Sequence, residues 1–241
     1  MRTMQRNDDT TIPALAIHGA GGGAWEWTIW QRVWQAQARP FVAPELMPAA
    51  AGLARTRLAD YLAQARAAAL ALPRPCLIGA SLGGLIALAL AAQVEASALV
   101  LVDALPPRGI APRPTARRSD GDIVLWASRR RFASTQRALP DADAAAQHHA
   151  FRRWRDESAA VLSDAVDGID VLPPGCPVLV IAAELDEAVP MEASQALAQR
   201  LGATFWPLQA SHVGPLLGRR AAATAAAALA WIQSVTHTAK P

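Results

Sequence analysis

The sequence predicts a single α/β domain built on a mostly parallel sheet of about six strands, with helices on both faces. A length of 241 residues suits one domain with a full core. Hydrophobic residues make up 52% of the chain and charged residues 18%, a balance that excludes a disordered or fibrous protein. Short apolar runs alternate with helical stretches, and this alternation favours right-handed crossovers between parallel strands.

Each predicted strand is a short apolar run, which is the pattern of a strand buried on both faces. In the first predicted helix Trp27, Trp30 and Trp34 recur at helical spacing, so we expect this aromatic face to pack on the sheet. The predicted strands lie at 14–17, 41–43, 76–79, 98–102, 178–182 and 204–206, and the helices at 25–37, 58–72, 82–93, 192–201 and 216–234.

Residues 104–171 interrupt the alternation and are predicted to form a helical cap inserted within a single domain of residues 1–241. Four prolines open this segment, and helical pieces follow at 123–139 and 143–162. Residues 106–137 carry a net charge of +6 (eight Arg against two Asp), and residues 138–171 carry −4 (three Arg against seven acids). Two interpretations stay open: the halves neutralise each other, or the basic half docks an anionic substrate or an acidic carrier.

Charge, cysteine content and hydropathy exclude several classes of protein. A net charge of +3 does not by itself supply the clustered basic face that nucleic acid needs, so we expect no nucleic-acid partner. Cys76 and Cys176 adjoin apolar runs, which favours buried thiols over a disulfide or a zinc site. The longest apolar stretch is too short to span a membrane, and the amino terminus lacks a signal-peptide core. We therefore expect a cytoplasmic protein with no membrane span.

The clearest chemical signal is a serine between glycines, in the run Gly79-Ala80-Ser81-Leu82-Gly83. The run follows one predicted strand directly and opens the next predicted helix. A serine on such a sharp turn needs small neighbours, because the strained backbone lifts its Oγ above the sheet. The motif in this context indicates a nucleophile.

The motif and its context resemble those of the α/β-hydrolase superfamily, from about residue 13 to residue 232. That superfamily has the chain order nucleophile, acid, histidine. The resemblance implies a compact serine esterase-like member in which Ser81 is the nucleophile, Asp186 the acid and His212 the base. Asp186 follows the apolar run 178–183, and His212 follows the last predicted strand. Alternatives for the acid are Asp103, Glu184 and Glu187, and alternatives for the base are His148, His149 and His237.

The glycine-rich run HGAGGGAW at residues 18–25 resembles the oxyanion loop of the same superfamily. Glycines let the backbone approach a substrate closely. The resemblance implies that the N–H groups of Ala20 and Leu82 form the oxyanion hole, with Gly21 as a substrate contact or a substitute for Ala20. Trp25, at the exit of the loop, is expected to line the substrate pocket.

These features predict a serine hydrolase that cleaves a carboxylic ester through an acyl-enzyme, with a small-molecule substrate and no metal or cofactor. Hydrolysis of thioesters on an acyl carrier protein or coenzyme A is the alternative activity, and a non-catalytic ligand receptor of the same fold is the second alternative. The loop and motif also resemble those of hydroxynitrile lyases, but these rely on a lysine in the site, and the only lysine here is Lys240. About a dozen residues precede the first strand, too few for the antiparallel hairpin that opens many members.

Overall fold

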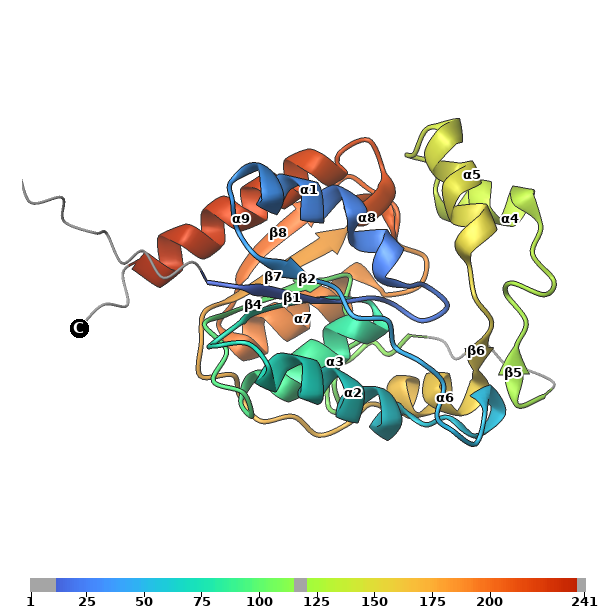
Figure 1. The fold of residues 1–241 in the computed structure, drawn as a ribbon, viewed down its shortest axis with the longest axis horizontal. Coiled ribbons are helices and arrows are strands. Elements are labelled where there is room, and N and C mark those ends of the chain that lie inside the picture. The colour runs from blue at the N-terminus through green and yellow to red at the C-terminus, as the bar shows by residue number, and fades with distance from the viewer. Residues whose placement is uncertain (1–11, 115–120, 238–241) are drawn as a thin grey trace, which may run out of the picture.

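Six parallel strands form the central sheet of the protein (Figure 1). The computed structural model describes residues 12–114 and 121–237. In spatial order the sheet runs β2, β1, β3, β4, β7, β8, and every neighbouring pair is parallel. The predicted strand count and strand direction are therefore confirmed. The strands are β1 (Ala14–Ile17), β2 (Phe41–Val42), β3 (Cys76–Ala80), β4 (Ala98–Val102), β7 (Val178–Ala183) and β8 (Thr204–Leu208).

The central strands read as unbroken apolar runs because helices cover both of their faces. Every residue of β1, β3, β4 and β7 is buried. Successive side chains point to opposite faces, so that Leu77 of β3 belongs to one hydrophobic core and Ile78 to the other. The register aligns the ends of these strands, since Ala80 of β3 lies opposite Val102 of β4. The loops that follow the strands therefore meet at one edge of the sheet.

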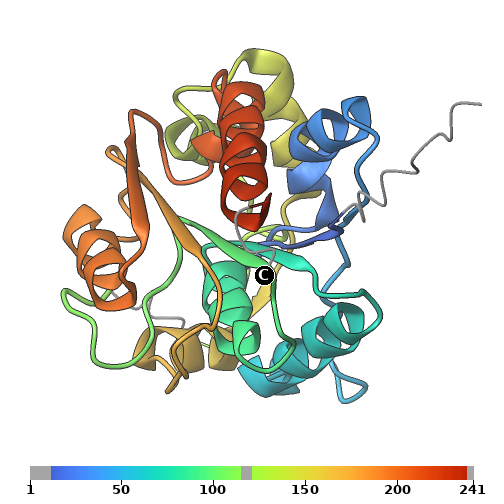
Figure 2. The same cartoon turned by 90° about the vertical axis from the view of Figure 1, so that its left-hand side faces the viewer.

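Helices form a layer on each side of the sheet (Figure 2). Side chains of α1 and α9 belong to one hydrophobic core, and those of α2, α3 and α7 belong to the other. Trp27, Trp30 and Trp34 are fully buried, which confirms the predicted aromatic face. The last predicted helix is divided in two, because α8 ends at Leu217, with Gly218 as its C-cap, before α9 begins. The helices are α1 (Thr28–Ala36), α2 (Leu58–Leu70), α3 (Leu82–Ala91), α7 (Met191–Leu201), α8 (Gly214–Leu217) and α9 (Ala221–His237), with a short 3-10 helix η1 (Ala24–Trp27) before α1.

The segment between β4 and β7, called the insertion below, stands at one end of the molecule (Figure 1). Its helices are shorter than the sequence predicts, and there are three of them where two were expected. The stretch predicted as helix from residue 123 begins instead with β5, whose two residues pair antiparallel with β6. The helix predicted at 143–162 is broken between α5 and α6, where residues 154–158 are not helical and include β6. The insertion contains β5 (Ile123–Val124), α4 (Phe132–Ala138), α5 (Ala144–Arg153), β6 (Glu157–Ser158) and α6 (Ala159–Asp167).

Polar contacts define the boundaries of the insertion helices. Asp143 caps α5 by accepting the Ala146 N–H at 2.7 Å, and Ser158 caps α6 by accepting the Val161 N–H at 3.4 Å. The Asp143 cap matches the predicted start at residue 143, and the Ser158 cap starts α6 as a helix separate from α5. Within the described ranges, no helix is both long and apolar enough to cross a membrane.

Candidate active site

Ser81 occupies the sharp turn between β3 and α3, and its backbone is strained. Its φ is +52° and its ψ is −119°, a conformation that costs a non-glycine residue on the order of 1–3 kcal/mol. Neighbouring strand ends keep it in place. The Ser81 N–H donates to the Val102 carbonyl at 3.0 Å, and the Ser81 carbonyl accepts the Leu105 N–H at 3.0 Å.

The two glycines of the serine motif occupy positions where no side chain fits. A Cβ on Gly79 would lie 2.2 Å from the Gly83 carbonyl oxygen, and a Cβ on Gly83 would lie 2.1 Å from the Ile17 carbonyl oxygen. Both separations are far inside van der Waals contact. The spacing seen in the sequence is therefore a packing requirement, because the first turn of α3 lies directly against the backbone that follows β1.

Asp186 and His212 come from the loops after β7 and β8 and form a close pair. The His212 Nδ1–H donates to Asp186 Oδ2 at 2.6 Å. The other oxygen of Asp186 accepts the N–H groups of Ala188 and Val189 at 2.6 and 3.0 Å, which fixes the carboxylate. Since Nδ1 carries the proton in this pair, Nε2 of the neutral ring is the nitrogen left to accept one.

The environment of His212 favours its protonated form. Burial disfavours the imidazolium, but the hydrogen bond and charge of Asp186, with smaller effects of Asp103 and Glu26, outweigh burial and raise the pKa of His212. The imidazole side chain is 23% exposed, and the Asp186 side chain only 1%. This arrangement suits a base that must take a proton and then hold it briefly beside a carboxylate.

Asp103, the main alternative for the acid, lies beside this pair but does not bind the imidazole. Its Oδ1 accepts the Ala183 N–H at 2.6 Å, and its Oδ2 is buried without a hydrogen-bond partner among the described residues. Burial, together with the nearby charge of Asp186, raises the pKa of Asp103 well above its usual range. Asp103, Asp186 and His212 have ligand-type atoms within 4.8 Å of one another. Within this cluster, Asp186 and His212 bond each other, whereas Asp103 Oδ2 is left without a partner among the described residues.

The loop formed by residues 18–24 passes directly beside the serine. A Cβ placed on Gly19 would lie 3.3 Å from the Ser81 Cβ. The N–H groups of Gly19, Gly21 and Gly22 donate to acceptors at 3.3, 3.0 and 3.3 Å. Among the described residues, the Ala20 N–H has no acceptor, and it is the one such N–H in this four-residue stretch.

A planar peptide gives the Ala20 N–H a defined direction. The Gly19 carbonyl, in the same peptide unit, accepts from His18 Nδ1 at 2.8 Å and from the Gly22 N–H at 3.3 Å. Carbonyl and N–H of a trans peptide point in opposite directions, so the Ala20 N–H points away from these donors. The Leu82 N–H, in the first turn of α3, also has no acceptor in the described part of the chain.

His18 braces the loop in a neutral state. Its Nδ1–H donates to the Gly19 carbonyl, and its Nε2 accepts the Leu46 N–H at 3.0 Å. Burial lowers the pKa of His18 to about 4. A ring with one nitrogen donating and the other accepting is the neutral tautomer, so His18 holds the loop and offers no free nitrogen as a base.

A buried acid, Glu26 of η1, lies under the same loop. Its carboxyl group is 2% exposed and accepts the Gly19 N–H at 3.3 Å. A Cβ on Gly22 would lie 2.1 Å from its Oε2. Burial raises the pKa of Glu26 to about 8. The sequence does not point to a role for Glu26, because a glutamate near the start of a helix is typical of an exposed position.

The insertion covers the loop and reaches the histidine. The predicted substrate contact Gly21 is buried, and Trp126 lies so close to it that a Cβ on Gly21 would be 2.3 Å from the indole. Trp25 packs edge-on against Trp154, with ring centroids 5.2 Å apart. Asp141 accepts the N–H of Ser211, the neighbour of His212, at 2.9 Å. The sequence did not point to these contacts, since they join residues far apart in the chain.

The fold agrees with the comparison to known proteins. Residues 14–227 match the model of the alpha/beta hydrolase family, and the chain therefore belongs to that family. No curated protein sequence matches the chain at a significant level.

Solved structures that resemble the chain include several hydrolases at low sequence identity. A methylesterase, MES16 from Arabidopsis, is 16% identical with a TM-score of 0.73, covering 92% of this chain and 99% of its own. A structure described with the metagenome-derived lipolytic enzymes LipS and LipT is 17% identical with a TM-score of 0.67, and the match covers 93% of this chain and 94% of that one. The thioesterase domain from the curacin biosynthetic pathway is 17% identical with a TM-score of 0.65, and the match covers 93% of this chain and 91% of that one. The chain is thus a hydrolase-family protein with esterase, lipase and thioesterase neighbours.

Proposed function

We propose that this protein is a serine hydrolase that cleaves a carboxylic ester through an acyl-enzyme. The observation that carries the proposal is the pairing of a strained serine turn with a histidine–aspartate hydrogen bond at the same edge of the sheet. Ser81 is the nucleophile, His212 the general base and Asp186 the residue that fixes the imidazole. The N–H groups of Ala20 and Leu82 are the oxyanion donors, and their lack of acceptors in the described part of the chain supports this role.

The reaction follows from these positions in two halves. Ser81 Oγ attacks the ester carbonyl carbon while its proton passes to His212 Nε2, and the carbonyl oxygen takes up the negative charge between the two N–H groups. The tetrahedral intermediate then releases the alcohol, which takes the proton from His212 and leaves an acyl group on Ser81. A water molecule attacks the acyl carbon, gives its proton to His212, and the collapse returns the proton to Ser81 and frees the acid.

We place the substrate's acyl or alcohol portion under the insertion. Trp126 and the edge-on pair of Trp25 and Trp154 supply apolar surface beside the loop. This supports the predicted role of residues 104–171 as a cap and of Trp25 as a pocket residue. The two cysteines are unpaired in the structure, which supports a cytoplasmic location as part of the same proposal.

The test is hydrolysis of a series of p-nitrophenyl esters of increasing acyl length, together with labelling by a fluorophosphonate probe. We expect Ser81→Ala, His212→Ala and Asp186→Asn each to lower kcat by about 10³-fold or more. Asp103→Asn is the matched control, because Asp103 accepts the Ala183 N–H and does not bond the imidazole, and this variant should retain most of the activity. A wild-type protein that neither turns over an ester nor reacts with the probe would overturn the proposal and favour a ligand receptor of the same fold.

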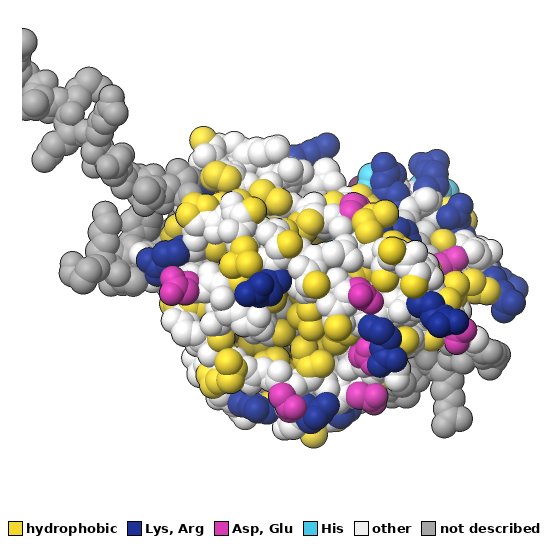
Figure 3. All heavy atoms as spheres, turned by 60° about the horizontal axis from the view of Figure 1, so that its bottom comes forward, with side chains coloured by type: hydrophobic (Ala, Val, Ile, Leu, Met, Phe, Trp, Pro, Cys, Tyr) yellow, Lys and Arg dark blue, Asp and Glu magenta, His cyan; other side chains and the backbone are white. Residues whose placement is uncertain are grey.

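A second candidate activity is hydrolysis of thioesters on an acyl carrier protein. Arginines gather at the end of the molecule formed by the insertion (Figure 3). Among the described residues, Arg108 pairs with Asp170 of the other half of the insertion at 3.2 Å, and Arg155 pairs with Glu45. Arg113 is committed to the Val166 and Pro107 carbonyls. The exposed group comprises Arg129, Arg130, Arg131, Arg152 and Arg153.

Charge complementarity with an acidic carrier is what favours this candidate. Replacing Arg130, Arg131 and Arg152 with Gln should lower kcat/KM for a carrier-bound thioester while leaving that for the same acyl group on a small thiol unchanged. Equal effects on the two substrates would remove the carrier as a partner and leave the ester hydrolase proposal standing.

A further inference from the structure

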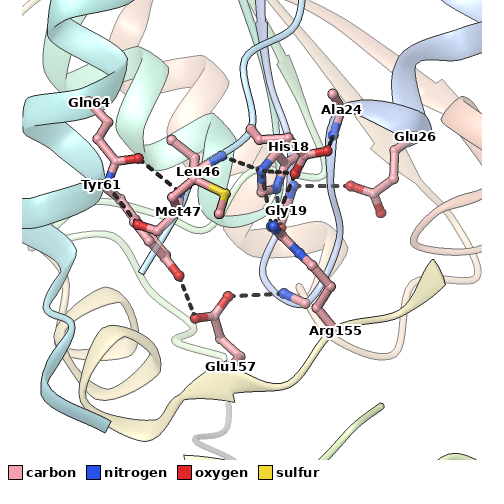
Figure 4. Close-up of polar contacts among 12 residues, drawn as sticks. His18, Gly19, Ala24, Glu26, Leu46, Met47, Tyr61, Gln64, Arg155 and Glu157 are labelled. Atoms are coloured by element: carbon pink, nitrogen blue, oxygen red, sulfur yellow. Dashed lines mark hydrogen bonds and ion pairs between the residues drawn. The ribbon is translucent and has the colours of Figure 1, made fainter. Parts of the chain in front are cut away.

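The tip of the loop beside Ser81 is held by the insertion. The Gly21 N–H donates to Glu157 Oε2 at 3.0 Å, and the Gly21 carbonyl accepts the Arg155 N–H at 2.7 Å. Gly21 has a φ of +66°, so it adopts a left-handed conformation that these two bonds fix from both sides. In Figure 4, Glu157 of β6 and Arg155, just before β6, approach the loop from one side, and Glu26 approaches it from another side.

Glu157 is a buried carboxylate whose hydrogen bonds bridge three parts of the fold. It is 2% exposed. Besides Gly21, it accepts the Tyr61 hydroxyl of α2 at 3.0 Å and its neighbour's N–H, that of Ser158, at 2.8 Å. A buried carboxylate with three donors is fixed in position, because each lost bond would leave a buried polar group unpaired. The loop tip is therefore tied to a rigid point.

The side chain of Arg155 secures the base of the same loop. Its Nη2 donates to His18 Nε2 at 3.3 Å, and its Nη1 pairs with Glu45 at 3.0 Å. Glu45 in turn accepts the Ala24 N–H at 2.8 Å. Since His18 holds the Gly19 carbonyl, the direction of the Ala20 N–H depends on a chain of contacts that begins at Arg155.

We propose that Glu157 and Arg155 are positioning residues of the hydrolase: they clamp residues 18–24 so that the Ala20 N–H faces the oxyanion. The inference rests on the proposed function for the role of Ala20. Neither side chain touches the reacting atoms; both act through the loop. The insertion would then form part of the catalytic apparatus as well as a cover for the substrate.

The test compares two carboxylates that each join the insertion to α2. Glu157 bonds Tyr61 and the loop, whereas Asp164 bonds Arg57 and the Leu58 N–H and has no contact with the loop. We expect Glu157→Ala to lower kcat by about 10- to 100-fold with KM changed by less than about 3-fold, because a misplaced oxyanion donor weakens the transition state alone. Asp164→Ala should leave both parameters within about 3-fold of wild type.

Three further readouts separate positioning from a general loss of structure. The affinity for an alkyl boronic acid, which mimics the tetrahedral intermediate, should fall in parallel with kcat in Glu157→Ala. Glu157→Gln keeps an oxygen that can accept the Gly21 N–H and should recover part of kcat. Tyr61→Phe removes one of the three donors that fix this carboxyl group while keeping the bond to Gly21, and should lower kcat by less than Glu157→Ala does. All rates are taken per active site titrated with the fluorophosphonate probe, so unfolded protein does not contribute.

Hydrogen exchange of residues 17–25 tests the clamp without relying on catalysis. Amide exchange there should be at least about 10-fold faster in Glu157→Ala than in Asp164→Ala. Equal exchange in the two variants, or a kcat in Glu157→Ala no lower than in Asp164→Ala, would overturn the inference. A wild-type protein inert toward esters, with faster loop exchange in Glu157→Ala, would instead refute the proposed function while leaving the clamp on the loop in place.

Discussion

Replacing Glu26 by glutamine should remove a strong pH dependence from the stability of the protein. Burial raises the pKa of Glu26 from its ordinary value of 4.5 to about 8. Between these two values the folded protein keeps a proton that the unfolded chain has released. Stability therefore falls as pH rises through this window, by about 1.4 kcal/mol per pH unit for one proton. From pH 5 to pH 8 the loss is about 4 kcal/mol.

Glutamine has the shape of the protonated acid and carries no charge at any pH in this window. Urea denaturation of the wild type and of Glu26→Gln at pH 5, 6, 7 and 8 measures the difference directly. The difference in free energy of unfolding, variant minus wild type, should be smallest at pH 5 and should be about 4 kcal/mol larger at pH 8. Groups shared by both proteins cancel in this difference. A difference that stays constant within about 0.5 kcal/mol across the four pH values would refute the assignment of a neutral buried acid.

Three other predictions concern the serine turn, the base and the aromatic core. Gly83→Ala should lower the free energy of unfolding by about 3 kcal/mol or more, since its Cβ would lie 2.1 Å from a backbone carbonyl oxygen. The control Gly175→Ala, where a Cβ would have no atom within 4 Å, should change that free energy by less than about 1 kcal/mol. The acid limb of the kcat/KM profile should have its midpoint above 6.5, because His212 must be neutral to act as a base and its pKa is raised; a midpoint below 6.5 would contradict the assignment. Trp34→Ala should lower the free energy of unfolding by about 3–5 kcal/mol, whereas Leu172→Ala at a 68% exposed position should change it by less than about 0.5 kcal/mol; calorimetry separates the two.

The sheet was predictable because its signals are local. Each central strand is buried on both faces and so is apolar at every position, and a parallel sheet needs a helical crossover between such runs. The serine turn was predictable for a related reason. Gly79 is required by contact with the Gly83 backbone four residues later, and Gly83 by contact with the Ile17 carbonyl of β1, but both glycines fall within one five-residue motif.

The insertion was harder to predict because its structure depends on distant partners. Residues 154–158 contain no glycine or proline, and a continuous helix was the natural expectation. The helix breaks there since Glu157 and Arg155 bond Gly21, more than 130 residues earlier in the chain. Likewise, the residues around Glu26 in the sequence do not indicate that it is buried. Its burial results from the packing of η1 beneath the loop of residues 18–24. The roles of Ser81, Asp186 and His212 stay predictions, although the structure brings the last two to 2.6 Å.

The two outer strands of the sheet bear on how copies of the protein behave at high concentration. β2 has only two residues, which leaves little backbone for another strand to pair with. On β8, the Leu208 carbonyl accepts the Glu184 N–H on the inner side, so by alternation the backbone of Pro207 faces the open edge. A proline there offers no N–H, and a strand added from another molecule would meet a gap in its ladder. Both edges of the apolar sheet therefore disfavour pairing with a strand from another copy of the protein.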